Sequence, residues 1–166
     1  MYLKKYYLLT ILLWPIILPT ASGNAQAGNM INYKVENHSI LQPLNGLAGD
    51  PDRGRLLVRN KNKGNCLSCH QLPIPEDDFH GTIGPSLYTI ADKFNAAQLR
   101  IRIADMKLIN PFTIMPGYYK STKKINRIAA QYAGKTILSA QQLEDIIAYL
   151  LTLKATAKET MNENQL

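Results

Sequence analysis

The chain has 166 residues, 46% of them hydrophobic and 19% charged, and its formal net charge is +7. A chain of this length buries enough surface for one domain and leaves little room for a second. The positive charge favours acidic partners. It is spread along the chain without the aromatic-interleaved basic stripe of a nucleic-acid binder, so we expect no nucleic-acid partner.

Residues 1–27 are predicted to be a signal peptide. Lys4 and Lys5 precede an apolar run of 13 residues (6–18), and an A-x-A cleavage signal ends at Ala27. The alternative is a membrane anchor, but spanning takes about 20 apolar residues and Pro15 interrupts this run. We therefore expect cleavage near Ala27, no anchor afterwards and a periplasmic protein. The signal holds two lysines and no acidic residue, so the mature chain carries +5.

The first helix is predicted after an N-terminal extension, residues 28–48, to which the sequence assigns no role. Asp50 is the expected N-cap, and Pro51 occupies the first helical position. We expect the helix to end near Gly64. Its inward-facing residues are predicted to be Leu56, Leu57 and Val58.

The stretch GNCLSCHQLP, residues 64–73, holds both cysteines and one of the three histidines. A disulfide across so small a loop adds little stability, structural zinc wants four ligands, and a thioredoxin-like pair belongs in a βαβ unit, which is missing here. C-x-x-C-H is also the attachment signature of c-type haem. With an export signal and no other cysteine, the motif predicts one haem c bound covalently to Cys66 and Cys69, with His70 on the iron.

A surface loop rich in proline, glycine and acidic residues follows, over residues 71–87. A ligating histidine normally donates its second ring N–H to a nearby carbonyl, and Pro85 is the local candidate acceptor for His70. Residues 86–109 then show helical apolar spacing with a break near Asn95.

In a second loop, residues 109–124, Met115 lies between two prolines. Met115 is the predicted sixth ligand of the haem iron. Its position 45 residues beyond His70 lets the chain wrap to the opposite haem face. Among the rivals, His80 would have to cross the haem edge within ten residues, and nothing fixes the location of His38. We expect both to be ordinary surface histidines. The other methionines of the mature chain are expected in core packing (Met106) or in the polar termini (Met30 and Met161).

The clearest helix begins after Ser139. Ser139 and Gln142 form a capping-box pair, and apolar residues recur with the helical period. Those residues are Leu143, Ile146, Ile147, Leu150 and Leu151. No convincing alternating strand is present, so the predicted class is all-α, with the terminal helices packed against each other.

Four joined stretches carry a family resemblance: GNCLSCHQLP, GTIGPSLYTIADKF, LRIRIADMKLINPFTIMPGYYK and AAQYAGKTILSAQQLEDIIAYLLTLK. The chain resembles a class I c-type cytochrome, and more specifically the SoxX family, the monohaem subunits of SoxAX sulfur-oxidation cytochromes. The resemblance covers residues 49–154 as the cytochrome domain. It leaves the extension at 28–48 and a C-terminal tail at 155–166 unassigned.

The resemblance implies thioether attachment at Cys66 and Cys69, His70 as proximal ligand and Met115 as distal ligand. It also implies that the carbonyl of Pro85 steadies His70. No catalytic residue is implied on this chain.

The function implied by the resemblance is electron acceptance inside an enzyme. SoxX pairs with SoxA in the periplasm, and the pair oxidatively joins thiosulfate to a cysteine of the SoxYZ carrier. The catalytic haem is expected on the SoxA-like subunit. The SoxX-like subunit receives the electrons and passes them to a small soluble cytochrome c.

Two other functions stay open from the residues. One is a free-standing periplasmic electron shuttle for an oxidase or peroxidase, docking through a cationic cluster at Lys120, Lys123, Lys124 and Arg127. The other is a haem sensor in which a gas displaces Met115. For a heterodimer, Tyr118 and Tyr119 are the candidate partner contacts, since tyrosine is enriched at interfaces; alternatively, they pack on the haem or the last helix.

Overall fold

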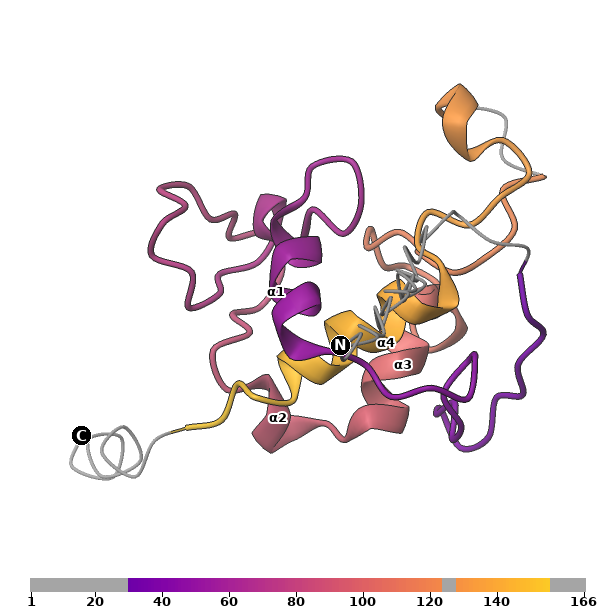
Figure 1. Ribbon diagram of the computed structural model, residues 1–166, viewed down its shortest axis with the longest axis horizontal. Coiled ribbons are helices and arrows are strands. Elements are labelled where there is room, and N and C mark those ends of the chain that lie inside the picture. The colour runs from indigo at the N-terminus through magenta and orange to yellow at the C-terminus, as the bar shows by residue number, and fades with distance from the viewer. Residues whose placement is uncertain (1–29, 124–127, 156–166) are drawn as a thin grey trace, which may run out of the picture.

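The computed structural model describes residues 30–123 and 128–155, and its helices pack around one core (Figure 1). The predicted signal peptide and nearly all of the predicted tail lie outside the described residues. The predicted all-α class is confirmed: within the described ranges the only β-structure is an isolated bridge between Glu36 and Ser39. None of the helices described is long and apolar enough to cross a membrane.

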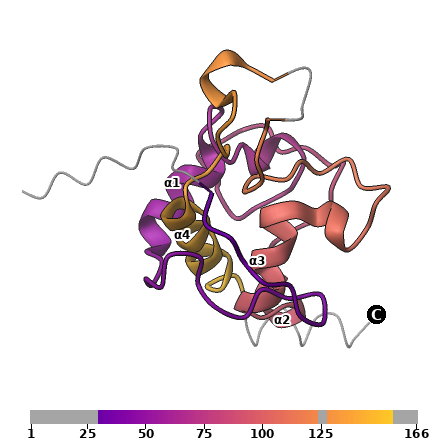
Figure 2. The ribbon, with the colours of Figure 1, turned by 90° about the vertical axis from the view of Figure 1, so that its right-hand side faces the viewer.

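The described residues form four α-helices and three short 3-10 helices. The α-helices are α1 (Pro51–Arg59), α2 (Ile90–Lys93), α3 (Ala96–Asp105) and α4 (Ala140–Leu150). The 3-10 helices are η1 (Cys66–Ser68), η2 (Met106–Leu108) and η3 (Ala130–Tyr132). In both views α2 lies at one end of the helical cluster and the segment with η3 lies at the other (Figures 1 and 2).

Helix α1 begins where the sequence predicts and ends earlier. The Asp50 side chain accepts the N–H of Arg53 at 3.0 Å and so caps the helix. The helix stops at Arg59 and not near Gly64, because Asn60 leaves the helical conformation and its carbonyl accepts the N–H groups of Lys63 and Asn65. These bonds turn the polar residues 60–64 into a loop that leads the chain to the first cysteine.

The predicted inner face of α1 is partly wrong. Val58 is completely buried, as expected, and Leu57 is partly buried. Leu56, in contrast, is 63% exposed. Successive residues of a helix are about 100° apart, so Leu56 and Val58 cannot both face the core.

Helix α4 is the centre of the fold and packs against both α1 and α3 (Figure 1). It starts with the predicted capping box, in which Ser139 and Gln142 exchange hydrogen bonds. Its apolar stripe is buried at Leu143, Ile146, Ile147 and Leu150.

The contact between α1 and α4 is close because α1 contains Gly54. A Cβ atom at this position would lie 2.0 Å from the carbonyl oxygen of Asp145 and 2.8 Å from Cβ of Tyr149. Only glycine lets the two helix backbones approach this far.

The predicted break near Asn95 separates α2 from α3. The Asn95 side chain accepts the N–H of Gln98, and the Gln98 side chain accepts the N–H of Asn95, which completes a second capping box. α3 therefore starts as a separate helix after Asn95, and it packs against α4.

The N-terminal extension, which the sequence left without a role, supplies part of the core. Ile40 and Leu44 are 2% and 6% exposed. The extension is tied down by a buried ion pair, in which the Arg100 guanidinium contacts both carboxylate oxygens of Glu144 at 2.8 and 2.9 Å. Arg100 also donates to the carbonyl of Ile40 at 2.7 Å, and Glu144 accepts the N–H of Leu44 at 3.0 Å.

Candidate functional site

The C-x-x-C-H motif occupies η1 and the residues just after it, and the loop that follows runs back along it. Three backbone N–H groups of that loop donate to the motif: Gly81 to the carbonyl of Leu67, Gly84 to that of Cys69, and Leu87 to that of Gln71, at 2.7 to 2.9 Å. These bonds fix the loop 71–87 beside the motif and bring its end, with Pro85, next to His70.

The His70 ring is held by the carbonyl of Pro85, as the sequence predicts for a ligating histidine. Nδ1 of His70 donates to this oxygen at 2.7 Å. The bond fixes the tautomer, so that Nε2 carries the lone pair available to a metal ion.

Gly84 makes this arrangement possible, and the sequence analysis did not identify it. A Cβ atom on Gly84 would lie 2.2 Å from Cε1 and 2.6 Å from Nδ1 of His70. The backbone at residue 84 therefore forms a wall directly against the imidazole. A glycine directly before Pro85 is the only sequence signal that marks this wall.

The distal side of the site is the segment that carries Met115, which is partly buried. After it, the backbone docks on the end of α3: the N–H of Tyr118 donates to the carbonyl of Ile103 at 3.1 Å, and that of Tyr119 to the carbonyl of Ala104 at 3.0 Å. α3 thus positions the loop that carries the predicted distal ligand.

Tyr118 links this distal segment to the motif. Burial raises the pKa of the Tyr118 hydroxyl, and the nearby thiols of Cys66 and Cys69 raise it further. Burial also raises the pKa of the Cys66 thiol to about 12. Tyr118, three residues after Met115, therefore lies near the cysteines, although the two segments are far apart in the sequence.

The donor set fits a covalently bound haem with two protein ligands. Cys66 and Cys69 are free thiols, not joined in a disulfide, and His70 beside them has its Nδ1 satisfied and its Nε2 available. A thioether sulfur at position 115 completes such a set. The described part of the chain has no comparable ligand set for a structural zinc ion, because no cluster of three His, Cys, Asp or Glu residues suited to a metal occurs there.

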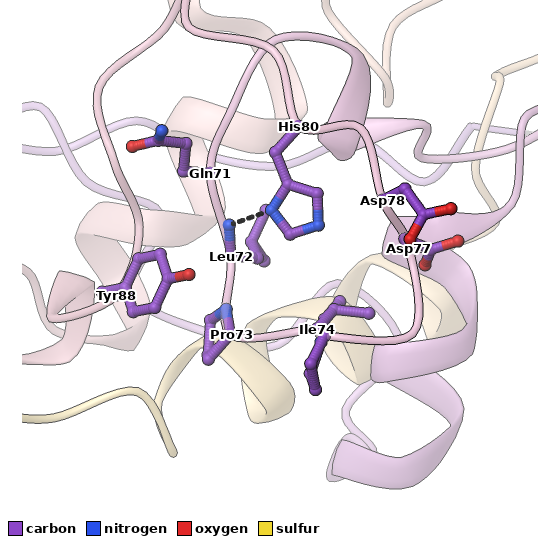
Figure 3. A pocket seen from close by; sticks show the side chains of 9 residues that line it. Gln71, Leu72, Pro73, Ile74, Asp77, Asp78, His80 and Tyr88 are labelled. Atoms are coloured by element: carbon purple, nitrogen blue, oxygen red, sulfur yellow. Dashed lines mark hydrogen bonds between the residues drawn. The ribbon is translucent and has the colours of Figure 1, made fainter.

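The prediction that His80 is an ordinary surface histidine is wrong. Its Nδ1 accepts the N–H of Leu72 at 3.3 Å, and its Nε2 is buried without a partner among the described residues. Figure 3 shows the ring packed between the backbone of Leu72 and the side of the loop that carries Asp78. An open cavity of about 590 Å³, lined by loop residues from Gln71 to Tyr88, lies here and not at the cysteines. His80 thus stabilises the loop to which it belongs through its bond with Leu72. His38 is exposed in a turn, as predicted for a surface histidine.

Two surface predictions also change. Tyr119 cannot contact a partner, because it is 1% exposed and its hydroxyl accepts the N–H of Ile31 at 2.9 Å. Lys120 is not a free docking charge, because its ammonium pairs with Asp105 at 2.9 Å. Of the remaining cluster, Lys123 is exposed, and Lys124 and Arg127 lie outside the described residues.

Among the described residues, the four large apolar side chains with the highest exposed fractions lie instead on the two loops that flank the site. Phe79 and Ile83, on the proximal loop, are 90% and 68% exposed. Phe112 and Ile114, on the distal loop, are 92% and 77% exposed.

Known proteins match this chain at the level of family and of fold. The family model described as "Cytochrome c" matches residues 51–154. A chain of the crystal structure of SoxXA from P. pantotrophus superposes with a TM-score of 0.69 and 34% sequence identity, over 74% of this chain and 95% of that one. No curated protein matches the chain significantly. The chain therefore belongs to the cytochrome c family, whose members bind haem c covalently, and is a SoxX-like cytochrome.

Proposed function

We propose that this cytochrome is the electron-accepting subunit of a periplasmic SoxAX-type L-cysteine S-thiosulfotransferase. The observation that carries the proposal is the likeness to a chain of SoxXA at 34% identity over nearly all of that chain. The chemistry of the predicted ligands adds support, because a haem iron bound by both His70 and Met115 would have no open position for a substrate.

In this proposal Cys66 and Cys69 hold one haem c, and His70 and Met115 are its axial ligands. When bound, the haem supplies a one-electron redox centre whose potential the methionine raises. The residues of the chain keep that centre closed. Pro85 fixes the His70 imidazole at 2.7 Å, and the partly buried Tyr118 side chain helps to exclude water.

The overall reaction takes place on the partner. The thiol of a SoxY cysteine and thiosulfate join through a new S–S bond, the thiol proton goes to solvent, and two electrons leave. This chain accepts those electrons one at a time and passes them to a small soluble cytochrome c. The exposed Phe79 and Phe112 favour a permanent SoxA-like partner over a free shuttle, because large exposed apolar side chains near a site mark interaction surfaces.

Reconstitution tests this role. Purified chain, SoxA-like partner, SoxYZ carrier, thiosulfate and an oxidised soluble cytochrome are expected to conjugate thiosulfate to the carrier and to reduce the cytochrome. Omission of this chain is expected to slow both rates. If the partner conjugates thiosulfate equally fast without it, the chain is not the electron acceptor of the reaction, and the free-shuttle function takes its place.

Mass spectrometry of the mature protein tests covalent haem attachment and export together. Protein purified from the periplasm of cells with haem-attachment machinery is expected to begin near Gly28 and to carry the mass of one haem. The variant Cys66→Ser/Cys69→Ser is the control, and it is expected to lack that mass. An unmodified mass for the wild-type chain would contradict the proposal.

A further inference from the structure

The stretch just before Met115, residues 110–114, is not held by a packed core. Its residues Phe112 and Ile114 are 92% and 77% exposed, in contrast to the buried Tyr119 further along the loop. Apolar packing therefore contributes little to the position of this stretch, and hydrogen bonds have to fix it.

Lys107 supplies the first of these bonds from the start of the loop. Its ammonium donates to the carbonyl of Pro111 at 3.2 Å and to the carbonyl of Thr113 at 3.0 Å. One cation thus bridges two carbonyls across the loop, and hydrogen bonds from a charged donor are stronger than those between neutral groups.

Thr113 passes this restraint on to Met115. The carbonyl of Thr113 accepts from Lys107, and its hydroxyl oxygen accepts the N–H of Met115 at 3.1 Å. Lys107 is therefore linked through a single residue to the backbone of the predicted distal ligand.

The start of this chain of bonds is itself anchored. The backbone N–H of Lys107 donates to Oδ1 of Asp105 at 3.2 Å, and Oδ2 of the same carboxylate binds the ammonium of Lys120 at 2.9 Å. Asp105 is 8% exposed at the end of α3. It therefore ties the beginning of the loop and the segment after it to one rigid point.

We propose that Lys107 and Thr113 are positioning residues for the distal ligand: their hydrogen bonds hold Met115 in place and oppose its release from iron. This inference rests on the proposed ligation of iron by Met115. An external ligand binds only to the fraction of protein whose methionine is released, so its apparent affinity measures how firmly the loop is held.

The test is a titration of the oxidised holoprotein with imidazole. Lys107→Met removes the charged donor while keeping a long side chain, and Thr113→Val removes the hydroxyl while keeping the shape. Each is expected to tighten apparent imidazole binding about tenfold, the effect of losing hydrogen bonds worth about 1.4 kcal/mol. The weak sulfur-to-iron band in the near-red is expected to be retained without imidazole in both variants.

Conservative variants separate positioning from general damage. Lys107→Arg and Thr113→Ser keep the donor and the hydroxyl, and are expected to bind imidazole nearly as weakly as the wild type. Lys93→Met, an exposed lysine of α2, is the matched control and is expected to change nothing. Thermal unfolding of every variant shows whether the fold persists.

The outcomes distinguish this inference from the ligation on which it rests. Met115→Ala is expected to lose the near-red band and to bind imidazole far more tightly than the wild type. Met106→Ala is expected to keep the band and to bind imidazole as weakly as the wild type. If Met115→Ala behaves so while Lys107→Met and Thr113→Val bind imidazole like the wild type, the positioning role is wrong and the ligation stands. If Met115→Ala changes neither property, both are wrong.

Discussion

Arg100→Leu is expected to lower the free energy of unfolding by about 3–5 kcal/mol, because it leaves the carboxylate of Glu144 buried without its counter-charge. Both side chains of this ion pair are only 4% exposed. The substitution also removes the donor to the carbonyl of Ile40. The N-terminal extension then keeps its bond from the N–H of Ile40 to the carbonyl of Ala97 in α3 but loses the bond from Arg100. The measurement is urea unfolding of the oxidised holoprotein, followed by circular dichroism.

A second substitution identifies the cause. Arg100→Leu/Glu144→Gln replaces the stranded charge by a neutral amide that still accepts the N–H of Leu44, and it is expected to recover at least half of the lost stability. The matched control is Arg55→Leu, which breaks a solvent-exposed pair with Glu76 and is expected to cost less than about 1 kcal/mol. If the double variant is no more stable than Arg100→Leu, the buried charge is not the source of the loss.

Gly84→Ala is expected to disturb the His70 side of the site while leaving the haem attached. The new Cβ would lie 2.2 Å from the imidazole, so the ring or the loop has to move, and the bond from Nδ1 to Pro85 is weakened. Overpacking of this kind costs about 1–3 kcal/mol of stability. The reduced protein is expected to bind carbon monoxide faster and to show partial loss of its low-spin absorption spectrum.

Gly46→Ala is the control for replacing a glycine. A Cβ at Gly46 meets nothing within 4 Å, but its φ of +72° disfavours alanine. This variant is therefore expected to lose about 1 kcal/mol of stability and to keep a wild-type spectrum. A wild-type spectrum and wild-type carbon monoxide binding in Gly84→Ala would show that His70 does not depend on the glycine wall.

Most of the helical fold could be predicted because local signals decide it. The caps predicted at Asp50 with Pro51 and at Ser139 with Gln142 both form. At Asn95 only a break was predicted, and the structure shows that a capping box with Gln98 makes it. The end of α1 was predicted too late, because the turn at Asn60 depends on backbone bonds from residues that the helical pattern does not mark.

The site could be predicted only where its chemistry lies within a short motif. His70 and Pro85 are 15 residues apart, and the need of a ligating histidine for a carbonyl pointed to their bond. Packing of Tyr119 was the alternative to a partner contact, but its neighbours could not be foreseen, since Ile31 and Tyr33 come from the opposite end of the chain. The salt bridge between Arg100 and Glu144 was not predicted for the same reason, because no local sequence signal pairs residues that are 44 apart.

The packing of the extension and α1 against α4 has a consequence for the order of events during folding. Leu44 and Glu144 are 100 residues apart, and the bond between them closes a loop that contains the whole C-x-x-C-H segment. Long loops carry an entropic cost that is repaid only when their ends meet, so contacts between distant residues form late and slow the folding rate. The chain is therefore expected to remain open until α4 is available to pack, which in the proposed periplasmic protein means until α4 has been exported. During that interval Cys66 and Cys69 are expected to be fully accessible to the haem-attachment machinery, whereas in the closed structure both are partly buried.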